Sequence, residues 1–148
     1  MSKIKFRIFF RRRRRAAPNK AEYHQHKEEA RSLVWARLVY WSRFAEQIED
    51  PRPERSGRSL SIEFGQVRIK NHKNAWGSCS SKKNLNFNWR LLNLSPELAD
   101  YVIVHELCHT VHLNHSPQFW ELVGRLLPEH RSLRARLRLN SVCQVRLV

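Results

Sequence analysis

The sequence predicts a single domain of the α+β class, with an N-terminal helix, a small and mainly antiparallel sheet, and a group of C-terminal helices. The chain has 148 residues, of which 41% are hydrophobic, and this is enough for one core. Apolar residues recur at helical spacing early in the chain and alternate with a period of two in its middle. Two serine–proline pairs then give helix start signals.

The first half of the chain predicts one long helix followed by strands. Apolar side chains recur every three or four residues from about 20 to 48, which favours a helix with one buried face. A charged connector that contains proline and glycine follows at 49–59. Alternating residues then indicate strands within 60–69 and over 85–91. The second of these is expected to run antiparallel to the segment before its turn.

Three more helices are predicted after the strands. Ser95-Pro96 and Ser116-Pro117 each have the order of an N-cap residue and a first helical residue. These signals predict helices over 96–113 and 117–127. A third helical pattern, which is strongly basic, ends near Leu139.

The composition is that of a basic protein with reduced thiols. The formal net charge is +15 at pH 7 and the pI is near 10.9, so polyanions are attracted to the chain. Three cysteines without CxxC spacing argue against a disulfide framework. The N-terminus lacks the apolar stretch of a signal peptide, and no run approaches a membrane span. We therefore expect a cytoplasmic protein with no membrane span.

A run of five arginines lies in the first 19 residues. Like charges at this density repel one another, so we expect 1–19 to be a mobile basic arm, followed by a folded domain over 20–140 and a tail over 141–148. Such an arm either improves solubility or tethers the protein to nucleic acid. The run consists of Arg11, Arg12, Arg13, Arg14 and Arg15.

The segment "VIVHELCHTVHLNH" contains the HExxH pattern. On a helix His105 and His109 lie one turn apart on the same face, so that two imidazoles can bind one zinc ion. Glu106 flanks the same position and can accept a proton from a zinc-bound water. The apolar residues before His105 predict a buried helix, in which these polar groups need partners. The competing interpretation is a hydrogen-bonded polar network on a core helix.

A catalytic zinc site needs a third protein ligand, and two histidines are candidates. On an ideal helix His112 lies on the face of His105, but three ligands along one stripe do not easily form a tetrahedral cap. His115 fits if the helix ends before it. Asn114 tolerates the left-handed conformation that ends helices, and the restart at Ser116-Pro117 requires a turn here. The turn therefore favours His115.

These residues occur in a block of about 45 that resembles the YgjP-like metallopeptidases, which belong with the zincins near the SprT-like and WLM-type proteases. The resemblance implies a zincin-like fold over 20–140 and a catalytic Zn²⁺. It also implies His105, His109 and His115 as metal ligands and Glu106 as general base. The hallmarks are "WGSCS", "NLNFNWRL", "DYVIVHELCH" and "NHSPQFW".

Two departures from the resemblance are visible. The first 19 residues look shorter and richer in arginine than the N-terminal strands of longer family members. His112 also stands where metzincins have a glycine, so the turn is made differently here. Trp76 to Ser80 either form or adjoin the edge strand that pairs with substrate in zincins, or simply pack under the metal helix.

The function predicted from these observations is that of a zinc metallopeptidase. It hydrolyses peptide bonds of a peptide or protein substrate through a zinc-activated water, with Glu106 as the base. One alternative is a SprT-like protease that is tethered to nucleic acid and acts on DNA- or RNA-bound proteins. The other is a non-catalytic binding module with a structural zinc, which a fourth ligand such as Cys79 or Cys108 would mark. The sequence does not identify the substrate, the oxyanion-stabilising residue or the oligomeric state.

Overall fold

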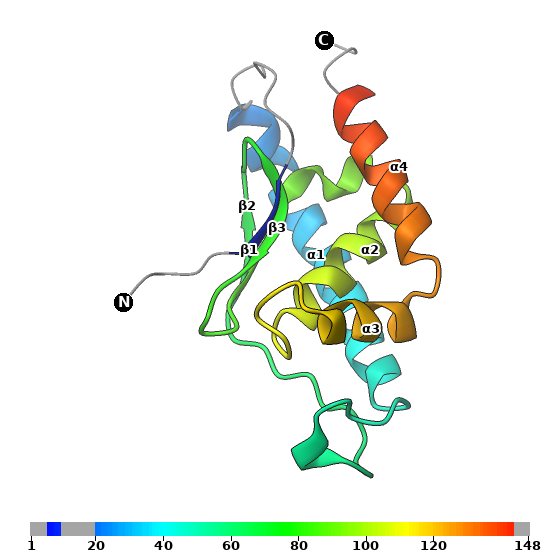
Figure 1. Ribbon diagram of the computed structural model, residues 1–148. Helices are drawn as coiled ribbons and strands as arrows, with labels where there is room; N and C mark the ends of the chain where they lie inside the picture. Colours follow the sequence, from blue (N-terminus) through cyan, green and yellow to red (C-terminus); the bar gives the residue numbers. More distant parts are fainter. Residues whose placement is uncertain (1–5, 10–19, 144–148) are drawn as a thin grey trace.

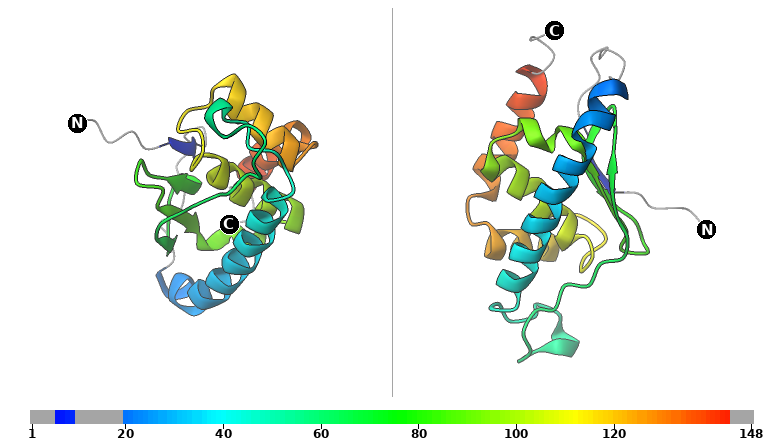
Figure 2. Two further views of the ribbon diagram at one scale, coloured as in Figure 1. Left: turned by 90° about the horizontal axis from the view of Figure 1, so that it is seen from below. Right: turned by 180° about the vertical axis from the view of Figure 1, so that it is seen from behind.

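The computed structural model describes the backbone of residues 6–9 and 20–143 and the side chains of residues 20–140. In this part of the chain a sheet stands on one side and the helices cover one of its faces (Figure 1, Figure 2). The helices are α1 (Lys20–Ala45), α2 (Pro96–Cys108), α3 (Pro117–Leu126) and α4 (His130–Cys143). The strands are β1 (Phe6–Phe9), β2 (Val67–Lys70), β3 (Ala75–Cys79) and β4 (Leu85–Asn88). The expected α+β, zincin-like architecture is confirmed.

The sheet has the strand order β1-β3-β4-β2. β3 is antiparallel to both β1 and β4, whereas β2 is parallel to β4. The mainly antiparallel sheet is therefore confirmed, as is the pairing across the turn after β3. Strand β1 was missed, because its four residues lie in the segment that the arginine run marked as an arm. The run itself, Arg11 to Arg15, lies outside the described residues.

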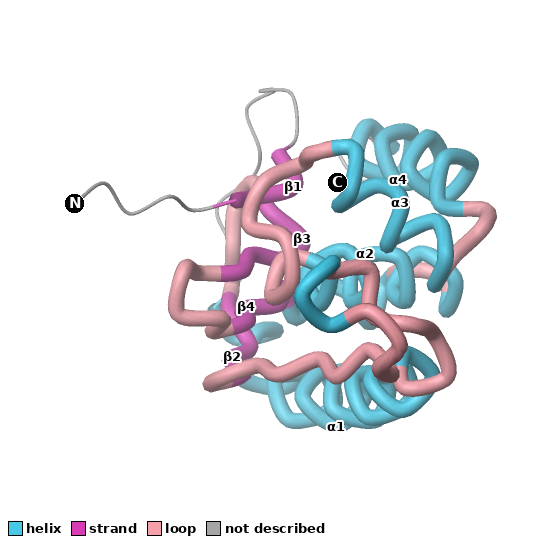
Figure 3. The backbone as a smooth tube through the Cα atoms, turned by 60° about the horizontal axis from the view of Figure 1, so that its bottom comes forward, coloured by secondary structure: helices cyan, strands magenta, loops and turns pink. Residues whose placement is uncertain are grey.

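The alternating segment 60–64 is not a strand, and this part of the prediction is wrong. It belongs to no strand of the sheet, yet Leu60 is buried and Ile62 and Phe64 pack against the core. The period-two pattern thus records the burial of every second side chain of a loop. That loop runs across the helical side of the molecule before it reaches β2 (Figure 3). The strand predicted over 85–91 also ends early, at Asn88, where the 3₁₀ helix η2 (Trp89–Asn93) begins.

Helix α2 lies at the centre of the fold. It contacts α1, α3, α4 and β3, and every residue from Leu98 to Cys108 is buried. The hydrophobic core surrounds it, with Leu38 of α1, Phe87 of β4 and Leu122 of α3 all fully buried. Burial of so many apolar side chains stabilises the helix by tertiary packing, since an isolated helix of this length is marginal in water.

Helix α2 ends five residues earlier than predicted, at Cys108 instead of Leu113. The last turn tightens, because Thr110 N donates to Leu107 O and Val111 N donates to Cys108 O. The side chain of Thr110 also donates to Leu107 O. The prediction that the helix ends before His115 is confirmed. The restart at Ser116 is confirmed as well, and its hydroxyl accepts from Phe119 N as an N-cap.

An ion pair with two hydrogen bonds joins α1 to α2. Arg37 of α1 donates through Nε and Nη2 to the two carboxylate oxygens of Asp100 on α2. The Asp100 side chain is 13% exposed, and hydrogen bonding to Asp100 raises the pKa of Arg37.

No described helix is both long and apolar enough to cross a membrane.

Replacing Asp100 with Ala should lower the free energy of unfolding by about 1.5–3 kcal/mol, because the half-buried guanidinium of Arg37 loses two charge-assisted hydrogen bonds. Chemical denaturation monitored by tryptophan fluorescence measures the change. The control is Glu28→Ala, which breaks the exposed pair with Arg31 and should cost less than about 0.5 kcal/mol. Equal effects of the two substitutions would show that the α1–α2 pair contributes nothing specific.

Candidate metal centre

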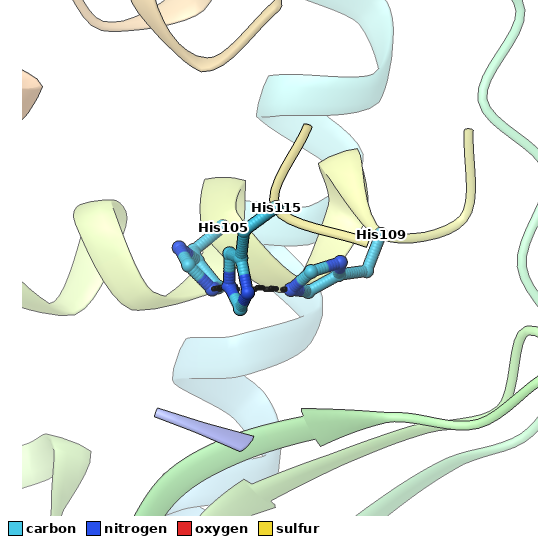
Figure 4. Close-up of side chains that lie close together, drawn as sticks. All are labelled: His105, His109 and His115. Atoms are coloured by element: carbon cyan, nitrogen blue, oxygen red, sulfur yellow. Dashed lines mark hydrogen bonds between the residues drawn. The ribbon is translucent and has the colours of Figure 1, made fainter. Parts of the chain in front are cut away.

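Three histidines converge at the end of α2. His105 and His109 lie one turn apart on the helix and are buried, while His115 comes from the loop that leads to α3 and is exposed. Their Nε2 atoms face one another (Figure 4). The separations are 3.2 Å between His105 and His109, 3.2 Å between His109 and His115, and 3.1 Å between His105 and His115.

This triangle of nitrogens fits a tetrahedral metal ion. Nitrogens bound at about 2.0–2.1 Å to a tetrahedral zinc lie about 3.3–3.4 Å apart, close to the observed separations. Protons alone do not satisfy the triangle, because a ring nitrogen that carries a proton cannot also accept a hydrogen bond. A cation bound by all three lone pairs does satisfy it. Three imidazoles on one side leave the fourth coordination position open, as in catalytic zinc sites.

The surroundings hold the rings in the form that binds metal. His109 Nδ1 lies 3.1 Å from the carbonyl oxygen of His112, and donation through Nδ1 leaves the Nε2 lone pair free. Burial lowers the pKa of His109 to about 4 and that of His105 well below its usual value. Burial also lowers the pKa of His115. The three rings are therefore neutral near pH 7, as metal ligands must be.

Aromatic side chains of α3 stack on two of the three histidines. The ring of Phe119 stacks on His109, with centroids 4.3 Å apart and planes 23° apart. The ring of Trp120 stacks on His115, with centroids 5.6 Å apart and planes 21° apart. Because α3 begins directly after His115, its first turn supplies both rings. This stacking makes "NHSPQFW" one structural unit with the metal helix.

Glu106 follows His105 directly on α2. Its side chain is fully buried, and neither carboxylate oxygen has a hydrogen-bond partner among the described residues. Burial raises the pKa of this carboxyl group well above its usual value. A buried carboxylate without partners is costly, and a nearby cation offsets that cost. A cation held by the histidine triangle, which begins at the residue before Glu106, would offset this cost.

Gly77 of β3 makes room for Glu106, and sequence reasoning missed this role. A Cβ at position 77 would lie 2.7 Å from Glu106 Cγ and 2.9 Å from Oε1, closer than real contacts allow. The signal was available, because glycine inside a strand often marks a close approach. Its neighbours Trp76 and Cys79 are both 2% exposed. They pack under the metal helix, and β3 lies beside the edge strand β1 instead of being an edge itself.

The remaining sequence candidates lie elsewhere. The ring of His112 does not join the three converging histidines; its backbone carbonyl instead accepts from His109. Cys79 and Cys108 are buried free thiols, and burial raises the pKa of Cys79 to about 12. Neither is grouped with the three histidines, so the described residues supply a three-histidine donor set.

The fold and the group of three histidines are those expected of a metallopeptidase. The chain belongs to the YgjP-like family, because the sequence model of the YgjP-like metallopeptidase domain matches residues 5–140. Among solved structures, the metallopeptidase zymogen of Pyrococcus abyssi abylysin is similar, with 23% identity and a TM-score of 0.54. The match covers 72% of this chain and 93% of that chain, and at this identity it shows the fold. A search of curated proteins found no match.

Replacing Gly77 with Ala should displace the Glu106 side chain and lower the free energy of unfolding by about 1–3 kcal/mol. Denaturation is measured in the presence of a chelator, so that metal binding does not enter the result. The control is Gly124→Ala on α3, where the added methyl would lie 3.2 Å from His130 Cε1 and helix propensity partly offsets the contact. A Gly77→Ala protein as stable as the wild type would show that β3 does not pack closely on Glu106.

Proposed function

We propose that this chain is a zinc-dependent peptidase that uses His105, His109 and His115 as ligands and Glu106 as general base. The observation that carries the proposal is the convergence of three Nε2 atoms within 3.2 Å beside an unpaired buried carboxylate. Nitrogen ligands in a three-histidine set suit zinc, whereas magnesium and calcium prefer oxygen. The family supports peptide or protein as the substrate class.

Zinc, Glu106 and the histidines have different roles in the proposed hydrolysis. When bound, zinc would supply Lewis-acid polarisation of the scissile carbonyl and acidification of a water molecule. Glu106 accepts the proton of the attacking water and delivers it to the leaving amine. Because its oxygens are not used by any described structural hydrogen bond, the carboxylate is free to move that proton. The buried rings of His105 and His109 keep the inner side of the site dry, and His115 faces the solvent side from which substrate enters.

A structural zinc is the less favoured alternative. A closed structural site has four protein ligands, whereas the described residues bring only three donors together. The free thiols that would complete such a site, Cys79 and Cys108, lie outside the group. These buried thiols also lead us to propose a reducing compartment, the cytoplasm, as the location.

A nucleic-acid-tethered protease is the second candidate function. The net charge of +15 favours contact with polyanions. The exposed Arg131, Arg134 and Arg138 of α4 have no carboxylate partner among the described residues. Arg11 to Arg15 would add to this contact, as the sequence suggests. Under this candidate the same metal centre cleaves proteins that are bound to DNA or RNA.

Replacing Glu106 with Gln should keep about one zinc per chain and lower kcat on a cleavable peptide at least 100-fold, because an amide cannot accept the proton. Zinc is measured by elemental analysis after dialysis, and cleavage by mass spectrometry of a peptide mixture. Full activity of the Glu106→Gln protein would contradict the mechanism. Loss of the metal would instead make Glu106 a ligand.

Replacing His115 with Ala should weaken zinc affinity strongly, because one of three ligands is lost. Replacing His112 with Ala should keep the metal, because only the backbone carbonyl of His112 supports the site. The two variants form a matched pair of histidines in the same loop, and parallel zinc titrations with a chromophoric chelator compare them. Loss of zinc from His112→Ala with retention by His115→Ala would contradict the proposed ligand set.

A further inference from the structure

A groove of about 640 Å³ lies between α3 and α4, beside the metal centre. Trp120 and Glu121 line it from α3, and Arg131 and Arg134 line it from α4. Both helices pack against α2, and in Figure 1 α4 rises steeply from near the end of α3. No step of the proposed mechanism uses this groove.

The wall of the groove is continuous with a metal ligand. Trp120 stacks on His115 on one side, and the guanidinium of Arg134 lies 4.7 Å from the centroid of the Trp120 ring. Since the rings of Trp120 and His115 are 5.6 Å apart, the guanidinium is at most about 10 Å from the His115 ring. An extended peptide covers that distance in about three residues.

The charge of the groove is positive. Arg131, Arg134 and Arg138 follow one another at spacings of three and four, so they lie on one face of α4. All three are exposed, and none forms an ion pair with a carboxylate among the described residues. Glu121, the acidic residue of the lining, is already paired with Arg125 on its own helix.

We propose that Arg134, with Arg131 beside it, binds a carboxylate of the substrate, so that the enzyme prefers peptides with an acidic side chain within about three residues of the scissile bond. This inference rests on the proposed peptidase function. A guanidinium binds a carboxylate through two parallel hydrogen bonds, which a lysine cannot reproduce. Stacking on Trp120 restrains the Arg134 side chain before substrate arrives, and this lowers the entropic cost of binding.

The test compares peptides that differ only in charge. An alanine-rich, fluorescently labelled series carries a single Glu, or Gln in its place, at each of three positions on either side of a central bond. Affinity is measured by fluorescence anisotropy with the zinc-loaded Glu106→Gln protein, which does not turn the peptides over. Cleavage is measured as kcat/KM with the enzyme that has Glu106.

Three substitutions of α4 are introduced into both backgrounds. At the preferred position, the Glu peptide should bind about tenfold or more tightly than the Gln peptide. Arg134→Ala should bring this affinity ratio to about one. Arg134→Lys should restore only part of it. The control Arg136→Ala changes an arginine that faces Glu97, away from the groove, and should leave the ratio unchanged. In each case the Gln peptides should change by less than about twofold, because an uncharged side chain gains little from the guanidinium.

Equal binding of Glu and Gln peptides at all positions, or a ratio that survives Arg134→Ala, overturns the inference. A single-stranded oligonucleotide is titrated in parallel. If its affinity depends on Arg134 while the peptide ratio does not, the groove is a nucleic-acid site and the inference is wrong. Failure of the peptidase proposal is distinguishable, because it would give an Arg134-dependent preference in binding without cleavage of any peptide.

Discussion

Helix α2 is buried on every side, and the rest of the structure depends on this burial. A helix in such a position normally carries apolar residues alone, but this one holds His105, Glu106 and His109 near its end. A buried polar group without a hydrogen-bonding or charged partner destabilises the folded state by about several kcal/mol, because it has lost its hydration. The histidines point their lone pairs at one place, and the carboxylate has no described partner. A cation bound among the three Nε2 atoms would satisfy the facing lone pairs and offset the charge of the carboxylate.

The neighbouring elements pack closely around Glu106 and the three histidines. Strand β3 supplies a glycine where any side chain would collide with Glu106. The early end of α2 turns the chain back so that His115 reaches the other two histidines, and α3 then begins at once with Phe119 and Trp120 stacked on the ligands. Trp120 connects this arrangement to the groove, because the Arg134 guanidinium lies 4.7 Å from the centroid of its ring. Metal centre and groove are thus parts of one packed layer formed by α2, α3 and α4.

The sequence predicts most of this layer because its signals are local. The HExxH spacing places two histidines on one helical face, and Ser116-Pro117 requires a turn that favours His115 over His112. The prediction of a strand at 60–64 was wrong, because the alternation of apolar and polar residues indicates which side chains are buried but not whether the segment pairs with another strand. Strand β1 forms by pairing with β3, about 70 residues further along the chain. The role of Gly77 depends on its close approach to Glu106, about 30 residues further along. Such long-range contacts leave only faint marks on composition or periodicity.

Zinc K-edge X-ray absorption of the purified, zinc-loaded protein tests the central claim most directly. The account predicts three imidazole nitrogens at about 2.0–2.1 Å, one further oxygen ligand from water, and no sulfur. His115→Ala should reduce the imidazole contribution by one ring. A sulfur ligand at about 2.3 Å, or a fourth protein ligand that closes the site, would contradict a catalytic three-histidine centre.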